Sequence, residues 1–415
     1  MYPVDTPEVI IHKRVYDNPL ATARLERMMK CIKADRVTEA TDDAELAALA
    51  LERGWDNVSG RTGSHHLVRD PVIVFNTYQW ISEEQRGALI GEHPILGRAM
   101  LSGTHAWTLR DHREIMDNMD SVCQSAWEIH CAFGCLHACQ YCHVYPWFDI
   151  MLNLEELAEK IHEFGETIPE QTLYKFDNYT DTPALEPEYG ASDVMVRMFA
   201  EWENRYLLLY TKSDNVDHLL DLPHNGKTIV SWSLSSDFVS REIEDKTPPM
   251  DDRIAAMVKC EKAGYAVRAR ISPTTPVKGW EQGYAELIEK LLTQVQPDVI
   301  SLDVIGWMTP AMMKDALDTS LLDDDFLAEL NRLEAEGFKP RGKHLFSHGM
   351  RARILRHLIA EIRKHRPDQS LSICVETVEM WKELKPLLGE MTPGDYACVC
   401  GPTCVAGHRL LSVGR

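Results

Sequence analysis

Residues 206–236 read YLLLYTKSDNVDHLLDLPHNGKTIVSWSLSS, two apolar runs of strand length separated by a short helical segment. The same alternation continues on both sides of this stretch. Strands are expected at 127–134, 172–180, 206–213, 228–236, 266–276 and 298–308, and helices at 152–165, 192–204, 216–222, 251–264 and 284–295. Strands that alternate with helices pair in parallel through right-handed crossovers. We therefore predict an α/β fold whose centre, residues 121–310, is a partial (β/α)6 barrel with its chemistry at the carboxyl ends of the strands.

Two further regions flank this barrel. Residues 1–120 show no strand–helix alternation and are expected to form a mainly helical N-terminal extension, with helices at 22–34 and 42–54. Residues 311–415 are expected to form a C-terminal α/β extension that ends in a cysteine-rich tail. The sequence thus predicts three domains, a number that a chain of 415 residues accommodates.

Net charge and hydropathy limit the cellular location and the binding partners that can be expected. The formal net charge is −20, which disfavours an electrostatic grip on DNA or RNA, so we expect nucleic acid to be an unlikely partner. No apolar run approaches the roughly 18 residues of a membrane span, and the start lacks the pattern of a secretion signal. We expect a cytoplasmic protein without a membrane anchor.

The sharpest motif is GCLHACQYCHVYPW, residues 134–147, in which Cys135, Cys139 and Cys142 have the spacing C-x3-C-x2-C. Three thiolates on a short loop can hold three irons of a [4Fe–4S] cluster, which normally takes four cysteines. The fourth iron then stays open for a substrate or a second cofactor. A structural zinc site is the alternative, but it would use paired C-x2-C units, of which this motif has one. Cys131, four residues upstream and within a strand, is expected to be a core residue.

This spacing, with the aromatic Tyr141 before the third cysteine, resembles the signature of the radical S-adenosylmethionine (SAM) superfamily. The resemblance implies an enzyme, a lyase or an oxidoreductase, with a [4Fe–4S] cluster whose open iron binds SAM. It also implies that an electron from the cluster cleaves SAM to a 5′-deoxyadenosyl radical. A reducing partner such as flavodoxin or ferredoxin would supply that electron.

Longer blocks resemble one family within this superfamily, the spore photoproduct lyases. They are YLLLYTKSDNVDHLL (206–220), HNGKTIVSWSLSS (224–236), the stretch 261–291 and IRKHRPDQSLSICVETVEMW (362–381). The resemblance covers residues 126–400 and implies that Lys212 and Ser233 contact SAM, with Thr180 and Tyr141 as further candidates.

Two departures from the family bear on the substrate. The resemblance implies a cysteine at the end of the second strand that returns a hydrogen atom to the product radical, but KFDNYTDT (175–182) contains none. The residue after the last cluster cysteine, a tyrosine in the lyase, is His143 here. His143, Asn178 and Tyr179 are therefore the catalytic candidates. We expect hydrogen abstraction from a small molecule or natural-product intermediate, with a DNA-repair lyase of the spore photoproduct type as the alternative.

A second cysteine group lies in the tail, ACVCGPTC (397–404). Cys398, Cys400 and Cys404 fall within seven residues, and Cys374 at the end of the last expected strand could join them. Four cysteines would complete an auxiliary iron–sulfur cluster or a zinc site. Reduced thiols in the tail are the alternative.

Overall fold

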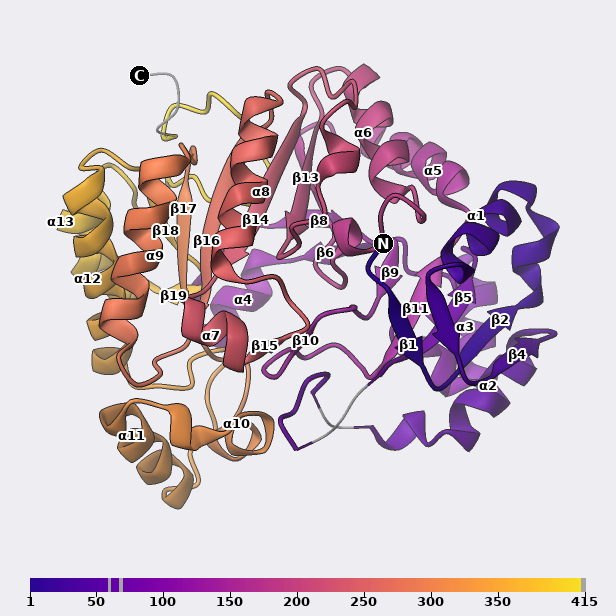
Figure 1. Ribbon diagram of the computed structural model, residues 1–415, viewed down its shortest axis with the longest axis horizontal. Helices are drawn as coiled ribbons and strands as arrows, with labels where there is room; N and C mark the ends of the chain where they lie inside the picture. The colour runs from indigo at the N-terminus through magenta and orange to yellow at the C-terminus, as the bar shows by residue number, and fades with distance from the viewer. Residues whose placement is uncertain (59–60, 67–69, 412–415) are drawn as a thin grey trace.

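The computed structural model describes residues 1–58, 61–66 and 70–411, and its main sheet has eight strands in the order β18-β17-β16-β14-β13-β12-β8-β6 (Figure 1). These strands are β6 (Trp107–Arg110), β8 (Ala126–Ile129), β12 (Leu173–Phe176), β13 (Tyr206–Thr211), β14 (Thr228–Leu234), β16 (Ala266–Thr274), β17 (Ile300–Val304) and β18 (Leu371–Ile373). Every neighbouring pair is parallel except β6 with β8. Each of the six strands predicted for the barrel is present, in the predicted order, so the α/β fold is confirmed.

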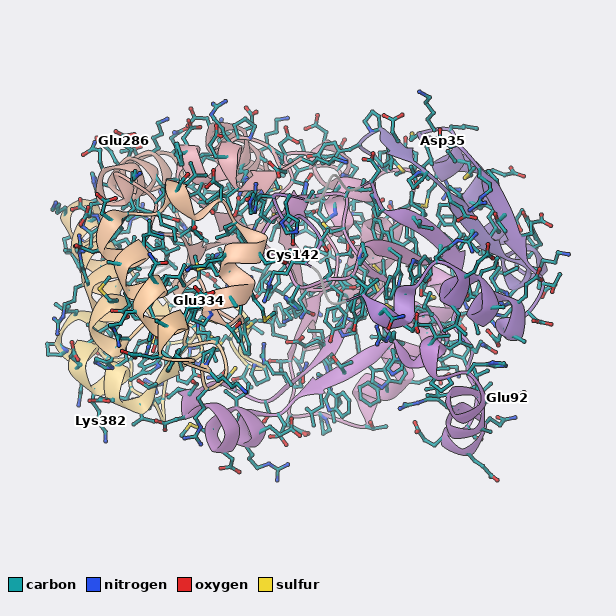
Figure 2. The ribbon with its side chains drawn as sticks, turned by 90° about the horizontal axis from the view of Figure 1, so that it is seen from below. Asp35, Glu92, Cys142, Glu286, Glu334 and Lys382 are labelled. Atoms are coloured by element: carbon teal, nitrogen blue, oxygen red, sulfur yellow. The ribbon has the colours of Figure 1, made fainter. Side chains whose placement is uncertain are left out.

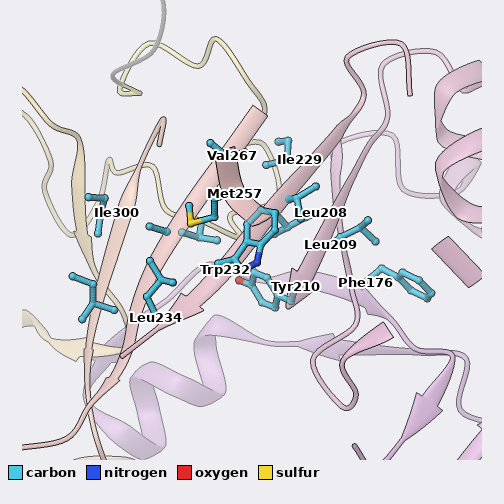
Figure 3. Close-up of a cluster of buried hydrophobic side chains, with 14 of the residues drawn as sticks. Phe176, Leu208, Leu209, Tyr210, Ile229, Trp232, Leu234, Met257, Val267 and Ile300 are labelled. Carbon is cyan, nitrogen blue, oxygen red and sulfur yellow. The ribbon is translucent and has the colours of Figure 1, made fainter. Parts of the chain in front are cut away.

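Helices follow the barrel strands and cover their outer face. They are α5 (Leu154–Glu166), α6 (Ala191–Glu201), α7 (Asp237–Glu242), α8 (Met250–Lys262) and α9 (Trp280–Gln294). Trp232 of β14, Val267 of β16 and Met257 of α8 are fully or almost fully buried in one hydrophobic cluster (Figure 3). Because side chains alternate along a strand, the residues on the other face point into the barrel, where the polar side chains described below lie.

A second sheet occupies the N-terminal part, at the right of Figure 1, with strand order β4-β2-β5-β11-β9. Its strands are β2 (Val9–His12), β4 (Val37–Ala40), β5 (Val72–Asn76), β9 (Ala132–Phe133) and β11 (Trp147–Met151). A short parallel pair, β1 (Val4–Thr6) with β3 (Ile32–Ala34), lies beside it. The helices beside this sheet are α1 (Pro19–Met29), α2 (Asp43–Glu52) and α3 (Glu83–Glu92), whereas α4 (His112–Met119) lies below the barrel strands in Figure 1.

The expectation that residues 1–120 lack strand–helix alternation is therefore wrong, although α1 and α2 lie where helices were expected. These strands are only three to five residues long, which is too short for a periodicity to stand out. The expected helix at 22–34 ends at Met29 because the chain turns into β3. The Asp42 side chain caps α2 by accepting a hydrogen bond from the Glu45 amide.

The N-terminal sheet crosses the boundary expected at residue 120. β11 follows the cysteine loop of the barrel region, yet it pairs in parallel with β5 of the N-terminal region. All five residues of β11 are buried. The two regions therefore share a sheet as well as one continuous hydrophobic core.

The C-terminal region adds α10 (Pro310–Ala316), α11 (Asp324–Ala335), α12 (His348–His365) and α13 (Val378–Leu388), seen at the left of Figure 1. Two antiparallel pairs complete the strands, β7 (Ser121–Val122) with β19 (Glu376–Thr377), and β10 (Ala138–Cys139) with β15 (Glu244–Asp245). The 3-10 turns are Lys13–Asp17, Trp55–Asn57, Pro94–Gly97, Thr182–Leu185, Asp217–Leu219 and Thr319–Leu321. None of the described helices is long and apolar enough to cross a membrane.

Candidate functional site

A cavity of about 620 Å³ lies inside the barrel and extends to the carboxyl ends of its strands. This volume is in the range of small-molecule and cofactor sites. Alternation along the strands supplies its polar lining in pairs two residues apart: Lys175 with Asp177, Tyr210 with Lys212, and Arg270 with Ser272. The expectation that strand ends would face one active-site mouth thus matches the position of this cavity.

The three cysteines of the loop motif, Cys135, Cys139 and Cys142, all line this cavity. Figure 2 places Cys142 near the middle of the molecule, between the N-terminal strands and the C-terminal helices. β10 fixes the loop by pairing with β15, and the Cys142 amide donates to the Cys139 carbonyl over 2.9 Å. The loop enters through Gly134 at φ +123°, where a Cβ would lie 2.7 Å from the Phe148 Cα.

The donor set of the loop fits a cluster with one open iron. A [4Fe–4S] cluster binds each of its cysteines at a different iron, and here three thiols line one cavity. Cys131 is fully buried beside Thr182, 3.6 Å from its Oγ1, which agrees with its expected place in the core.

A buried carboxylate organises one side of the loop. Glu244 accepts a hydrogen bond from the Tyr141 hydroxyl and lies 2.7 Å from Arg253 and 3.6 Å from the Lys212 ammonium. Burial disfavours the charged form of Glu244, but Lys212 and Arg253 outweigh burial and hold its pKa at about 2. Glu244 thus holds two of the residues that the sequence assigned to SAM, Tyr141 and Lys212, beside the cluster loop.

The remaining SAM candidates, Thr180 and Ser233, line the same cavity. The Thr180 hydroxyl is buried and has no hydrogen-bond partner among the described residues. A buried hydroxyl without a partner costs free energy, so this position suits a bound polar group. Next to it, Asp181 accepts from the Lys212 amide over 2.6 Å and lies 3.2 Å from His137, a residue of the cluster loop.

The three catalytic candidates lie along one wall. His143 and Asn178 are exposed to the cavity, and Tyr179 is half-buried against His130, with ring centroids 4.1 Å apart. Burial and the neighbouring Arg61 lower the pKa of His143 below its ordinary value, so its ring is neutral at pH 7. Asp177 in turn positions His130. The Oδ1 of Asp177 lies 2.8 Å from the Nδ1 of His130, as a hydrogen-bond acceptor or as an ion-pair partner.

The N-terminal region reaches over the cluster loop. Arg61 donates to the Tyr141 carbonyl over 2.6 Å and to the Trp307 carbonyl over 2.5 Å, so it joins the loop to the end of β17. The Thr62 amide donates to the Cys142 carbonyl over 3.1 Å. The mouth of the cavity is therefore formed by both the barrel and the N-terminal region.

The tail cysteines lie at the opposite ends of the strands. The Pro402 carbonyl accepts from the Leu173 amide at the start of β12 over 2.8 Å, so the tail runs beneath the barrel. Cys400 lines the inner part of the cavity, and the Cys398 thiol lies within hydrogen-bonding reach of Cys400 and Cys404. Hydrogen bonding by Cys398 and the charge of Arg110 hold the pKa of Cys400 well below its usual range, despite burial.

Cys374, the fourth expected member of this group, lines the cavity at the end of β18. Its carbonyl accepts from the Lys343 ammonium, which is also paired with Asp303. Burial, with a contribution from Asp303, raises the pKa of Cys374 to about 11, so its thiol is protonated at neutral pH.

Several residues of the site have no local sequence signal. Glu244, His137, Asp181, Arg61 and Arg110 come from turns or from the flanking regions, and only the three-dimensional fold brings them together. Two of these residues could have been suspected from their place in the sequence. His137 lies inside the cysteine motif, and Asp181 lies inside KFDNYTDT, the segment at the end of the second strand.

Comparison with known proteins supports the family resemblance. The sequence model of the spore photoproduct lyase family matches residues 113–372. Among curated proteins, the spore photoproduct lyase of Bacillus subtilis (strain 168) is 33% identical over 175 residues, which cover 40% of this chain and 51% of that protein. The enzyme of Geobacillus sp. (strain Y412MC61) is 30% identical over 172 residues, 40% of this chain and 50% of that protein. The chain thus spans about half the length of the curated relatives it matches.

Solved structures show the same fold. A spore photoproduct lyase mutant with bound AdoMet and dinucleoside spore photoproduct superimposes with a TM-score of 0.61 at 20% identity, covering 90% of this chain and 100% of that one. A second structure, a complex with dinucleoside spore photoproduct, gives a TM-score of 0.60 at 19% identity, covering 90% and 99%.

These comparisons correct the binding partners expected from the sequence. The expectation of a small-molecule substrate, with nucleic acid as an unlikely partner, is contradicted, because the relatives are spore photoproduct lyases and the structural neighbours hold a dinucleoside lesion. The physical reason is that net charge describes the whole surface, whereas the cavity is lined locally by cations such as Arg61, Lys212 and Arg270. A dinucleoside enclosed in a cavity does not require a basic surface.

Proposed function

The chain belongs to the spore photoproduct lyase family, and on that premise we propose that it is a radical SAM lyase that repairs a spore photoproduct lesion of DNA. The observation that carries this proposal is the common cavity: Cys135, Cys139 and Cys142 line the same space as the four SAM candidates, Tyr141, Thr180, Lys212 and Ser233. A cluster and SAM bound there would supply the one-electron cleavage that allows a hydrogen atom to be removed from the substrate.

The residues around the loop would bind and orient SAM. Lys212 carries a positive charge into the cavity, which suits a carboxylate, and the Thr180 and Ser233 hydroxyls suit a ribose or a carboxylate. Glu244 limits the movement of Lys212 and Tyr141, since it contacts both. Arg61 and Thr62 close the side of the loop and exclude water from it.

His143 and its neighbours would hold the lesion. The neutral ring of His143 can accept a hydrogen bond from the imide N–H of a thymine, and the Asn178 amide can donate to a thymine carbonyl. Tyr179, stacked on His130, offers an aromatic surface to a base. Replacing His143 by Leu should raise KM about 10-fold with a smaller change in kcat, which corresponds to one hydrogen bond. His143→Gln, which keeps an acceptor, should recover most of the loss.

Return of a hydrogen atom to the product radical requires a weak bond to hydrogen, and S–H is weaker than an amide N–H or an alcohol O–H. No cysteine ends β12, but Cys374 faces the cavity as a protonated thiol. Cys374→Ala should leave SAM cleavage unchanged while lowering the yield of repaired thymines. The repair reaction of the unmodified protein can also be run in D2O. If the product then contained no deuterium, a donor whose hydrogen exchanges with solvent, such as this thiol, would be excluded.

The decisive test is repair itself. Anaerobically reconstituted and reduced protein, supplied with SAM and a dinucleoside spore photoproduct, should yield thymidine detectable by mass spectrometry. Cys139→Ala is the control and should yield none. Cleavage of SAM without any consumption of the lesion would refute the substrate while leaving the radical SAM chemistry intact.

The tail cysteines, with Cys374 as the fourth member that the sequence suggests, are a proposed second metal site, an auxiliary iron–sulfur cluster or zinc. No step of the repair reaction depends on it. The contacts of these cysteines limit which of them can be its ligands.

A further inference from the structure

We propose that Cys123, Cys398, Cys400 and Cys404 bind an iron–sulfur cluster beneath the barrel, with Cys123 as a ligand in place of Cys374. This site goes beyond the proposed lyase activity and does not depend on it. It lies at the starts of the barrel strands, whereas the loop cysteines lie at their carboxyl ends.

Three of the thiols are held together by the path of the tail. Cys398 reaches both Cys400 and Cys404. The tail backbone is fixed from the barrel, because Arg268 of β16 donates to the carbonyls of Val399 over 2.7 Å and of Cys404 over 2.6 Å. A tail bound in this way is not a loose end that carries free thiols.

The segment after β7 brings Cys123 to the same place. Gln124, its neighbour in sequence, donates to the Tyr396 carbonyl over 2.9 Å, and its Oε1 lies 3.9 Å from the Cys404 Sγ. Arg110 donates to the Gln124 carbonyl over 3.1 Å and to the Cys400 Sγ over 3.2 Å. The Cys123 thiol itself lies close enough to Arg110 and Cys400 for both to act on its pKa.

Cys374 is held differently. Its amide donates to the Leu302 carbonyl over 2.8 Å, and its carbonyl accepts from Lys343. Both contacts hold its backbone near the end of β17, and its thiol faces the reaction cavity, where Asp303, Lys343 and Arg270 act on it more strongly than Cys400 does. This position suits the role given to Cys374 above.

The charges around the tail cysteines suit an anionic centre. Four cationic side chains surround them, namely Arg110, Lys175, Arg268 and Arg270, and two carboxylates, Glu128 and Asp298, pair with these cations. Among these groups, two positive charges are not matched by a carboxylate. A cluster with a core charge of about +2 and four thiolate ligands carries a net charge of about −2 and would balance them.

Four thiolates can bind either an iron–sulfur cluster or a zinc ion. The experiment below therefore offers both metals at once, and binding of iron with sulfide is the result that the proposal requires.

A metal count separates this site from the first. The triple variant Cys135→Ala, Cys139→Ala, Cys142→Ala, reconstituted anaerobically with Fe2+ and sulfide in the presence of equimolar Zn2+, should retain about two to four iron atoms per chain with matching sulfide. It should also show a cluster signal in electron paramagnetic resonance after reduction. Its inability to cleave SAM makes this readout independent of the lyase proposal.

Single variants in that background assign the fourth ligand. Cys123→Ala should remove most of the remaining iron, whereas Cys374→Ala and the buried control Cys260→Ala should leave it unchanged. The unmodified protein gives a check that does not rely on variants folding, because its iron content should exceed that of one four-iron cluster. Zinc without iron, no metal in the loop variant, or loss of iron with Cys374→Ala but not with Cys123→Ala would overturn the proposal.

Discussion

The two cysteine groups lie at opposite ends of one barrel and are positioned by different means. The loop group is held mainly by backbone pairing, β10 with β15, and is accompanied by Glu244, Lys212 and Arg253. The tail group is held by side chains, chiefly Arg110 and Arg268, that donate to its carbonyls and to one of its thiols. A motif that is compact in sequence can be identified from spacing alone, whereas one assembled from distant segments can be identified only in the fold.

The largest contrast should appear in SAM cleavage. Cys139→Ala should reduce the formation of 5′-deoxyadenosine to background, because it removes a ligand of the cluster that binds SAM. Cys400→Ala should leave uncoupled SAM cleavage within about twofold of the unmodified protein, on the scale of ordinary variant effects. Chromatographic quantification of 5′-deoxyadenosine checks both, and equal loss in both variants would mean that the two groups act as one centre.

Each group has a buried ion pair, and breaking either should destabilise the fold by about 3–5 kcal/mol. Arg253→Met leaves Glu244 buried without its partner 2.7 Å away, and Arg268→Met does the same to Asp298 at 2.8 Å. Urea unfolding measures the free energies. Of these two variants only Arg268→Met should also increase proteolysis of the tail, because Arg268 donates to tail carbonyls and Arg253 does not. Replacing Asp298 by Leu in the Arg268→Met protein should recover much of the loss, and no recovery would contradict an ionic origin.

Acid should lower the stability of the protein through Glu244, the carboxylate beside the cluster loop. Its pKa is about 2 in the fold against an ordinary 4.5, so its stabilisation is complete above pH 4.5 and is lost as the pH falls towards 2. The difference corresponds to about 3 kcal/mol in the free energy of unfolding. Glu244→Gln should therefore be less acid-sensitive than the unmodified protein by about that amount. Parallel pH profiles for the two proteins would show that Glu244 is not the responsible group.

The smallest expected difference is in the stability cost of replacing one glycine beside each cysteine group. At Gly134, a side chain would meet a left-handed φ and the Phe148 backbone at 2.7 Å, so Gly134→Ala should cost about 2–3 kcal/mol. At Gly401, in the metal-free protein, a Cβ would meet the ends of the Gln124 and Cys404 side chains at 2.1 and 2.5 Å, which move more easily than a backbone does. Gly401→Ala should cost about 1–2 kcal/mol. Thermal unfolding orders the two variants, and the reverse order would show that the tail is packed more rigidly than the loop.

The barrel was predictable because its strands and helices are long enough to show their periods, as in β13, β14 and α8. The common location of Cys135, Cys139 and Cys142 in one cavity was predictable because they are neighbours in sequence. The N-terminal sheet was missed because its strands are short and two of its members, β9 and β11, come from the barrel segment. Glu244 was missed because its role depends on Tyr141, 103 positions away. Nucleic acid was wrongly expected to be an unlikely partner because net charge describes the whole surface and not a cavity.

The strand β11 has a consequence for how the molecule is made. Protein synthesis proceeds from the N-terminus, so β5 leaves the ribosome well before residues 147–151 can pair with it. Until then one edge of the first sheet stays open, and it closes only after the loop of Cys135, Cys139 and Cys142 has been synthesised. Deleting the first 120 residues would in turn strip β11 of one of its two partners, β5, and expose an apolar strand edge, the kind of surface through which chains aggregate. The N-terminal region is thus not a removable appendage, because it covers the edge of the strand that follows the loop of Cys135, Cys139 and Cys142.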